Sequence, residues 1–340
     1  MSDPRPAPPD AIAGTRLARG EGKLLVVCLD NLGDLVFASA LLPPLRERFP
    51  GARITLWCKS YTAEIAPLVP GVDAVVASDP FWDRSPGRGK GPLLPFLGAA
   101  RALRRERFDA ALLAFAPWRT AAAVSTLGIP VRIGRERHRN RPFLTHALPP
   151  EDKKRPVLAE LARLLEPLGI PPRPLRYRLE RAPLEARRTR LAPLLGDCPV
   201  ALHPFASKRG RCVDIREWIT VARALASRGA SPLWIGSAAE LSELRAAPGA
   251  GEEWRYADRL LAGSLADLAA ALSLATLFVG HDSGPLHIAG ALGVPCVGVF
   301  APGEPLRTFP QGVGPARMLA RPSPEGITAG DILAEVDALR

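Results

Sequence analysis

The segment spanning residues 279–300 limits the fold of this chain more than any other feature. It reads V-G-H-D-S-G-P-L-H-I-A-G-A-L-G-V-P-C-V-G-V-F, with a strand-like apolar stretch at each end. Residues 282–285 supply capping side chains and a proline at the start of a short helix that ends at Gly293. Such a strand–turn–helix–strand unit is typical of parallel α/β sheets. Its turn either binds an anion at the helix N-terminus or uses Asp282 and Ser283 only as caps.

A second unit of the same kind lies near the N-terminus. Residues 23–29 (K-L-L-V-V-C-L) read as a buried parallel strand, followed by Asp30-Asn31-Leu32-Gly33-Asp34 and by an apolar helix that continues to Phe49. Gly33 allows a tight turn, and a carboxylate at the helix start is stabilised in its ionised form. Asp34 therefore either caps this helix or accepts a proton from a substrate hydroxyl.

The alternation of strands and helices predicts two parallel, doubly wound sheets. We expect strands at residues 24–29, 53–58, 74–77, 110–115 and 131–134, and then at 199–203, 231–235, 277–279 and 295–300. We expect further helices at residues 93–107, around 121, and at 156–168, 184–195, 215–228, 265–273, 285–292 and 332–339. Ligands of such sheets bind at the carboxyl ends of the strands, where the turns described above lie.

The composition indicates a globular protein of two domains. The chain has 340 residues, of which 47% are hydrophobic and 23% are charged. No apolar run approaches the ~20 residues of a membrane helix. Residues 1–22 are rich in proline and arginine and predict a disordered tail rather than a signal peptide. The five cysteines are odd in number and far apart, which predicts neither disulfides nor a zinc site and favours the cytoplasm.

Charge is unevenly distributed along the chain. Residues 1–190 hold 32 basic and 19 acidic side chains (net +13), whereas residues 191–340 hold 13 and 15 (net −2). Five arginines lie within residues 132–141, either as a solvated loop or as a site for an anionic partner. No aromatic side chains alternate with them, so nucleic acid is not expected. A phosphorylated or acidic glycolipid at the inner membrane surface fits better.

Four motifs together resemble glycosyltransferase family 9, the bacterial lipopolysaccharide heptosyltransferase family. They are L-G-D at residues 32–34, R-I-G at 132–134 with T-H at 145–146, L-H-P at 202–204 with A-S at 206–207, and D-S-G-P-x-H at 282–287 with G-x-P at 293–295. The resemblance extends in order over residues 23–340. It implies a GT-B-like fold, in which two Rossmann-like domains face an interdomain cleft.

The resemblance also suggests domain limits. Residues 23–183 would form the acceptor-binding domain and residues 184–325 the nucleotide-sugar-binding domain. The C-terminal helix within residues 326–340 would pack back on the first domain. We expect a monomer in the cytoplasm or at the cytoplasmic face of the inner membrane.

By the same resemblance, the expected activity is inverting transfer of a sugar, chiefly heptose from ADP-heptose, to a lipopolysaccharide-core or other cell-envelope glycan. Asp34 occupies the position of the general base. The expected donor-binding residues are Ser207, Lys208, Arg211, Gly236, Asp282, Ser283, Gly284 and His287. The expected acceptor-binding residues are Asn31, Gly33, Lys59, Arg119 and Arg135.

The chain departs from the family pattern around the expected donor site. Arg211 replaces a lysine, Phe205 a glycine, Val213 a tryptophan, His281 an asparagine and Ala301 a glycine. A non-catalytic nucleotide-sugar or glycan-binding relative is therefore the alternative function. A hydride-transferring enzyme is disfavoured, because no G-x-G-x-x-G follows either leading strand.

No cofactor is expected. No D-x-D carboxylate pair follows a strand of the second half, and arginine, lysine and a helix end can neutralise the leaving diphosphate. The alternative is Mg²⁺ that is bound largely by the diphosphate itself.

Overall fold

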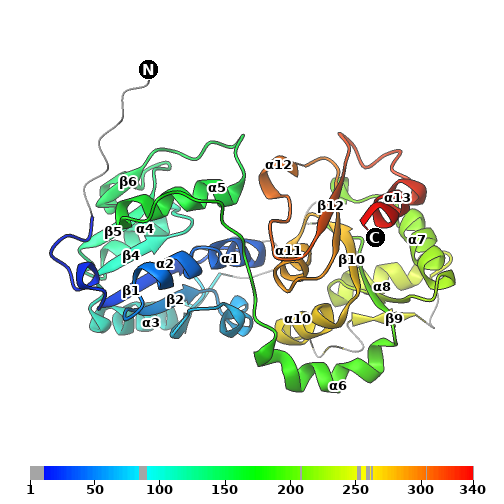
Figure 1. Cartoon of the computed structure of the whole chain (residues 1–340), viewed down its shortest axis with the longest axis horizontal. Helices are drawn as coiled ribbons and strands as arrows, with labels where there is room; N and C mark the ends of the chain where they lie inside the picture. The colour runs from blue at the N-terminus through cyan, green and yellow to red at the C-terminus, as the bar shows by residue number, and fades with distance from the viewer. Residues whose placement is uncertain are drawn as a thin grey trace. The chain divides into compact units, whose positions relative to one another are not determined.

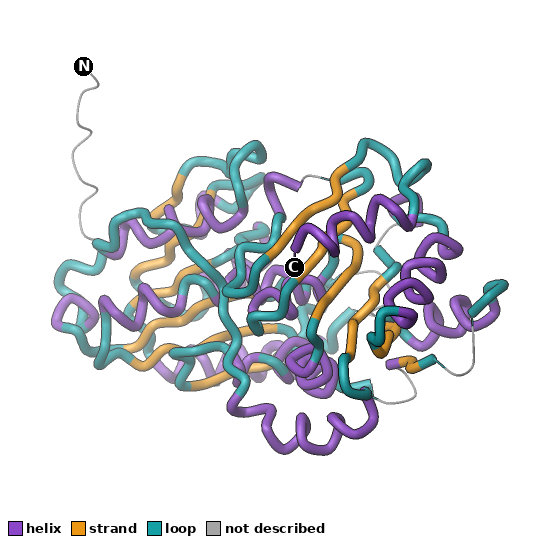
Figure 2. Tube along the Cα trace, turned by 45° about the vertical axis from the view of Figure 1, so that its right-hand side comes forward, coloured by secondary structure: helices purple, strands orange, loops and turns teal. Residues whose placement is uncertain are grey.

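The computed structural model describes residues 11–83, 90–206, 209–250, 254–257, 261, 263–303 and 305–339. It divides into two units, Met1–Leu175 and Arg176–Arg340. Each unit contains one six-stranded sheet in which every strand pairing is parallel. In each unit the strands run side by side among the helices (Figures 1 and 2). The expectation of two doubly wound α/β domains is confirmed, with the division at residue 175 rather than 183.

The first unit begins its sheet at a central strand. Its strands are β1 (Lys23–Cys28), β2 (Arg53–Cys58), β3 (Ala74–Ala77), β4 (Ala110–Leu113), β5 (Val131–Arg135) and β6 (His146–Leu148), in the spatial order β3-β2-β1-β4-β5-β6. Its α-helices are α1 (Leu32–Ser39), α2 (Leu42–Arg48), α3 (Leu93–Glu106), α4 (Trp118–Ser125) and α5 (Val157–Ala162). The strand order reverses between β1 and β4, which is the switch point where ligands of such sheets bind.

The core of the first unit lies between the sheet and helices α3 and α4. Residues of β1 and β4 are buried there together with Trp57, whose ring stacks on Phe96 of α3 at 5.4 Å. Leu103 of α3 and Val124 of α4 belong to the same cluster. The alternate residues of β1 and β4, which point to the other face, are also buried, and burial on both faces explains the continuous apolar runs of these strands.

The second unit repeats the same strand order. Its strands are β7 (Pro199–His203), β8 (Ser231–Trp234), β9 (Arg255–Tyr256), β10 (Leu277–His281), β11 (Cys296–Phe300) and β12 (Ala316–Ala320), in the spatial order β12-β11-β10-β7-β8-β9. Its α-helices are α6 (Glu185–Leu195), α7 (Ile215–Ser227), α8 (Ala238–Ala246), α10 (Leu265–Leu274), α11 (Gly284–Ala291), α12 (Pro305–Thr308) and α13 (Ala329–Leu339). The switch point lies between β7 and β10.

Local structure differs from the sequence prediction at several points. The helix expected to run from the L-G-D turn to Phe49 is two helices, because Pro43 and Pro44 at the start of α2 have no N–H to continue α1. The helices α8 and α12 and the strands β6, β9 and β12 were not predicted. Helix α5 is shorter than expected and continues as a 3₁₀ helix, Arg163–Leu168, which contains Pro167.

The structure also differs from the sequence prediction at both ends of the chain. Residues 1–10 lie outside the described part, but residues 11–22, expected in a disordered tail, pack on the first unit. Ile12 and Leu17 are buried, and Arg16 forms an ion pair with Asp109 at 3.0 Å. Two isolated apolar residues in a proline-rich stretch give no periodic signal, which is why the sequence missed this contact.

Helix α13 belongs to the second unit, whereas the sequence analysis expected it to pack on the first. It contacts α7, β11 and β12, and it buries Ile332 and Val336. Asp337 forms an ion pair with Arg228 of the segment that follows α7, at 2.7 Å. In Figure 1 the helix lies beside α7 and β12. The apolar face of α13 is therefore buried within the second unit.

None of the helices in the described part of the chain is long and apolar enough to cross a bilayer.

Candidate functional site

The turn after β1 carries the expected catalytic residue. Asp34 lies in the first turn of α1, and its Oδ2 accepts the backbone N–H of Asn31 at 2.9 Å. The Asn31 side chain accepts the Asp34 N–H in return, so the two residues form a capping box around Leu32 and Gly33. Asp34 is partly exposed. The capping contact is thus present, and it leaves open the role as proton acceptor, because a carboxylate has further lone pairs.

Asp30 is a second carboxylate at this sheet edge, and the sequence analysis did not select it. Its Oδ2 is buried and has no hydrogen-bond partner among the described residues. Burial, and next the negative charge of Asp34, raise the pKa of Asp30 to about 7, while Lys59 and Arg137 act in the opposite direction. Its position directly after a buried strand, four residues before Asp34, was the signal available in the sequence.

Two of the expected acceptor-binding cations are committed to structural ion pairs. Lys59 follows β2, is buried, and contacts Asp83 Oδ2 at 2.6 Å. Arg135 ends β5, is buried, and its Nη1 lies 2.9 Å from Glu160 Oε2 of α5. Removing one partner of such a buried pair leaves an uncompensated charge. These contacts favour a scaffold role for both cations at this edge.

Arg119 differs from these two cations because it is exposed. It lies in the first turn of α4, after β4, and its guanidinium lies 4.6 Å from the ring centre of Trp118. An exposed arginine beside an exposed aromatic ring at the carboxyl edge of the sheet can meet an anionic or sugar-bearing ligand. Together with Asn31 and Gly33 it remains a candidate for acceptor binding.

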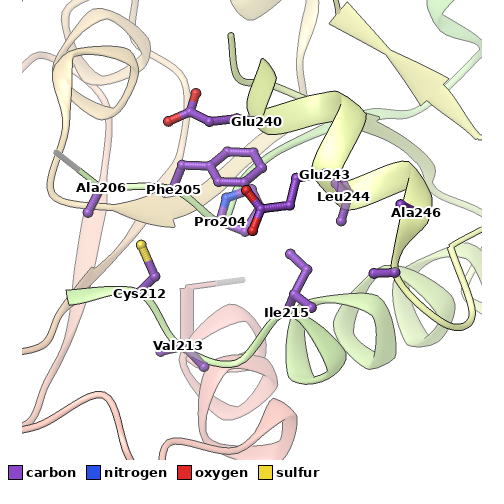
Figure 3. Close-up of a pocket in the computed structure, with 11 residues that line it drawn as sticks. Pro204, Phe205, Ala206, Cys212, Val213, Ile215, Glu240, Glu243, Leu244 and Ala246 are labelled. Atoms are coloured by element: carbon purple, nitrogen blue, oxygen red, sulfur yellow. The ribbon is translucent and has the colours of Figure 1, made fainter. Parts of the chain in front are cut away.

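The second unit has a cavity of about 470 Å³ at the carboxyl ends of β7 and β8. Figure 3 shows the side chains that surround it. They come from the segment after β7, the start of α7 with the residues before it, and the helix α8 with the residue after it: Pro204, Phe205, Ala206, Cys212, Val213, Ile215, Glu240, Glu243, Leu244, Ala246 and Ala247. The wall is mostly apolar and includes two carboxylates, Glu240 and Glu243. A pocket of this size and lining is typical of a site for a small organic ligand.

Gly236, expected to bind the donor, has a packing role at this cavity. A Cβ atom on Gly236 would lie 2.8 Å from Cε2 of Phe205, so only glycine leaves room for this ring. Glu240 caps α8, because its Oε2 accepts the N–H of Ser237 at 2.8 Å. The S-A-A-E pattern of residues 237–240 is a capping box that could have revealed α8 in the sequence.

A hydrogen bond connects the segment before α7 to the end of β10. The backbone N–H of Val213 donates to His281 Nε2 at 3.1 Å, and His281 Nδ1 lies 3.3 Å from the carbonyl oxygen of Val299. This network assigns the proton to Nδ1. Burial lowers the pKa of His281 to about 4, so the ring stays neutral and Nε2 stays an acceptor at neutral pH.

Arg211 lies two residues before Val213, in a short 3₁₀ helix. It forms no ion pair with any carboxylate in the described part of the chain. Its guanidinium is therefore available to an anionic ligand. Ser207 and Lys208, also expected at this site, lie outside the described residues.

Asp282 is held by a network that involves His287. Thr308 donates its hydroxyl to Asp282 Oδ2 at 3.0 Å, and His287 Nε2 lies 3.4 Å from Asp282 Oδ1. On the other side of the ring, the Tyr177 hydroxyl lies 3.1 Å from His287 Nδ1 and accepts the N–H of Gln311 at 3.1 Å. His287 and Tyr177 are buried, whereas Asp282 is partly exposed. The geometry makes His287 a positioning residue for Asp282 rather than an exposed ligand contact.

The start of α11 lies beside Asp282. Ser283 is the N-cap residue, but its hydroxyl donates to the carbonyl of His281 at 3.0 Å and does not cap the helix. The first turn therefore receives no side-chain cap from Ser283. A helix start in this state favours an anion. The structure thus groups Asp282, Ser283 and Gly284 at the end of β10.

Tyr177, Thr308 and the cavity glutamates were not found from the sequence. Tyr177 and Thr308 are far from Asp282 along the chain, and no local pattern marks them. Among the described residues, no group of three or more His, Cys, Asp or Glu side chains is arranged to hold a metal ion.

Comparison with known proteins gives consistent results. The family model described as glycosyltransferase family 9 (heptosyltransferase) matches residues 97–320. The lipopolysaccharide heptosyltransferase 3 of Escherichia coli is 23% identical over 279 residues, which cover 79% of this chain and 80% of that protein.

Two solved structures share the fold at low sequence identity. A glycosyl transferase family 9 protein from Veillonella parvula is 18% identical, with a TM-score of 0.79 over 94% of this chain and 97% of that one. The E. coli ADP-heptose lipopolysaccharide heptosyltransferase II is 18% identical, with a TM-score of 0.74 over 93% and 98% of the two chains.

Proposed function

Since this chain belongs to glycosyltransferase family 9, we propose that it transfers heptose from ADP-heptose, with inversion, to a lipopolysaccharide-core or related cell-envelope glycan. The general activity, glycosyl transfer within a GT-B fold of two Rossmann-like domains, follows from the family. The choice of ADP-heptose is supported by the name of the E. coli heptosyltransferase II, which shares the fold.

The proposed donor site rests mainly on the cavity after β7 and β8 (Figure 3). Its apolar wall suits a nucleobase, and Phe205 offers an aromatic face on which a base can stack. Glu240 and Glu243 can accept hydrogen bonds from ribose hydroxyls. The same two carboxylates would repel phosphates, so the diphosphate belongs outside this cavity.

The groups next to the cavity are better suited to bind the diphosphate. Val213 lines the cavity, and its bond to His281 places the segment that carries Arg211 next to the end of β10. Arg211 and the first turn of α11 both favour an anion there. Asp282, held by His287 and Thr308, would then accept hydroxyls of the transferred sugar. We propose that these residues bind ADP-heptose in that order, from nucleoside to sugar.

In the proposed reaction, an acceptor hydroxyl oxygen attacks the anomeric carbon of the donor. The bond between that carbon and the diphosphate oxygen breaks, and ADP leaves with the bonding electrons. The hydroxyl proton passes to the Asp34 carboxylate. A single displacement of this kind inverts the anomeric configuration. General-base catalysis typically contributes 10²–10⁴-fold to such a step.

We propose that the acceptor binds at the carboxyl edge of the first sheet, near Asn31, Gly33 and Arg119. The net charge of +13 in residues 1–190 supports an anionic acceptor. Lys59 and Arg135 would not contact the acceptor directly. Their ion pairs with Asp83 and Glu160 would stabilise this edge of the sheet. We further propose that turnover requires no metal, because Arg211 and the helix start can balance the charge of the leaving diphosphate.

Mass spectrometry of the envelope glycans tests the proposed function in the native bacterium. Deleting the gene should yield a glycan that lacks one heptose and everything attached beyond it, and the wild-type gene should restore it. An unchanged glycan would contradict the proposal. If the purified protein bound ADP-heptose but did not turn it over with that truncated glycan, the chain would be a binding relative instead.

A further inference from the structure

Helix α3 presents three leucines to solvent. Leu93, Leu94 and Leu97 are 48%, 79% and 45% exposed, whereas Phe96 and Leu103 of the same helix are buried in the core. At about 100° per residue, the three exposed leucines fall within roughly 100° of the helix circumference. Single exposed leucines are ordinary, but three on one helix face, at one end of the helix, form a patch.

The same face of α3 continues toward its C-terminus as arginines. Arg101, Arg104 and Arg105 are exposed and fall within roughly the same 120° of the circumference as the leucines. Arg104 donates to the carbonyl oxygen of Thr126 at 3.2 Å. None of the three arginines forms an ion pair with a carboxylate in the described part of the chain. The acidic residue of this helix, Glu106, is paired with Lys23 at 2.6 Å. The positive charge of this face is therefore not balanced locally.

Phe81 extends the apolar part of this face. It precedes α3, is 40% exposed, and packs edge-to-face on Phe96 with the ring centres 5.8 Å apart. We call the exposed set made of Phe81, Leu93, Leu94, Leu97, Arg101, Arg104 and Arg105 the α3 face. Its apolar and basic halves lie one after the other along a helix of 14 residues, which is about 21 Å long.

We propose that the α3 face docks on the anionic surface of a lipid bilayer. A helix that lies in the interface places apolar side chains at the boundary of headgroups and acyl chains, and it places arginines among the lipid phosphates. The net charge of +13 in residues 1–190 complements such a surface and adds long-range attraction. A protein partner would also cover leucines, but the unbalanced arginines on the same face favour phosphate-bearing lipid. The inference concerns membrane binding and goes beyond the proposed transfer reaction.

Vesicle sedimentation tests this inference without any turnover. The full chain should bind vesicles that contain phosphatidylglycerol, bind phosphatidylcholine vesicles much less, and dissociate as salt is raised. Replacing all three leucines (Leu93→Ser, Leu94→Ser and Leu97→Ser) should lower the partition coefficient at least about tenfold. Replacing the arginines (Arg101→Gln, Arg104→Gln and Arg105→Gln) should lower it by a similar factor and weaken the preference for anionic lipid.

Leu306 provides the matched control. It is 73% exposed on α12 of the second unit, so Leu306→Ser removes an exposed leucine outside the α3 face and should not change vesicle binding. Circular dichroism checks that each variant is folded. Absence of wild-type binding to anionic vesicles, or full binding by the leucine variant, would overturn the inference. A protein that binds the vesicles but does not turn over ADP-heptose would refute the proposed function alone.

Discussion

The backbone N–H of Val213 donates a hydrogen bond to Nε2 of His281, at 3.1 Å. By the resemblance described in the sequence analysis, both residues depart from the family pattern, and in the structure they contact each other. The bond joins the segment that carries Arg211 to the end of β10, one residue before Asp282. Two of the altered residues around the expected donor site thus contact each other, and we propose that this contact holds Arg211 near the start of α11.

Arg211→Ala should weaken ADP binding by roughly tenfold to a hundredfold in titration calorimetry. The reason is the loss of a charged hydrogen bond to the diphosphate. Lys208→Ala should have a smaller effect. The control is Arg223→Ala, which removes an arginine of α7 that donates to the carbonyl of Gly249 instead. Unchanged ADP affinity in both the Arg211 and the Lys208 variants would place the diphosphate elsewhere.

Asp34→Asn should lower kcat by roughly 10²–10⁴-fold, because asparagine cannot accept the acceptor's proton. ADP affinity should stay close to that of the wild type, since the proposed nucleotide contacts lie in the second unit. Asparagine can still accept the N–H of Asn31, so the helix cap is kept. Turnover near the wild-type rate in a folded variant would rule out Asp34 as the base.

Tyr177→Phe should raise the KM for ADP-heptose about tenfold while leaving the affinity for ADP unchanged. The Tyr177 hydroxyl contacts His287, and His287 contacts Asp282, which in the proposed complex binds the sugar that ADP lacks. NMR of the histidine nitrogens should show His287 with its proton on Nε2 in the wild type and a changed tautomer population in the variant.

Tyr256→Phe is the control for this network, because it removes a buried tyrosine hydroxyl from β9 of the same unit. It should alter neither the tautomer of His287 nor the KM for the donor. Equal losses of ADP and ADP-heptose affinity in Tyr177→Phe would point to general disruption and contradict a role at the sugar.

Asp30 should make stability depend on pH. Its folded pKa of about 7 lies above the ordinary value of 3.8. The unfolded chain therefore loses this proton first as pH rises, while the folded chain retains it. The contribution of Asp30 to stability is fully present below about pH 4 and is lost as pH rises to about 7, by at most about 1.4 kcal/mol per pH unit. In urea unfolding, the wild type should lose stability relative to Asp30→Asn between these limits. Parallel pH profiles for the two proteins would exclude a raised pKa.

The central strands and the turns after them could be predicted from the sequence because their signals are local. The buried strands β2 and β7 have the predicted limits, since continuous apolar runs end at polar turns. The edge strands β9 and β12 could not be found in this way. β9 has two residues, and β12 exposes Met318, so neither shows a buried run. Pairing with a neighbouring strand, rather than local pattern, defines them.

The candidate site was only partly predictable, for a related reason. Asp282 and Ser283 were found because strand, turn and helix follow one another in the chain. Tyr177 was missed, although its hydroxyl contacts His287, because 110 positions separate the two residues. This contact is one of several between residues 176–181 and the rest of the second unit, which begins at Arg176 rather than at residue 184. Acceptor binding by Arg135 stays a prediction, but its buried ion pair with Glu160 was missed for the same reason, since the two residues are 25 positions apart.

Transfer of heptose by the purified protein is the most direct test of the proposed glycosyl transfer. The reaction would contain ADP-heptose, the truncated glycan from the deletion strain and excess EDTA, with ADP release and the anomeric configuration of the product followed by NMR. We expect ADP release that depends on the acceptor, a product with inverted configuration, and the same rate with or without the chelator. Failure to transfer heptose, or a product that retains the donor's configuration, would contradict the account. Activity lost in EDTA and restored by Mg²⁺ would contradict metal-independent catalysis.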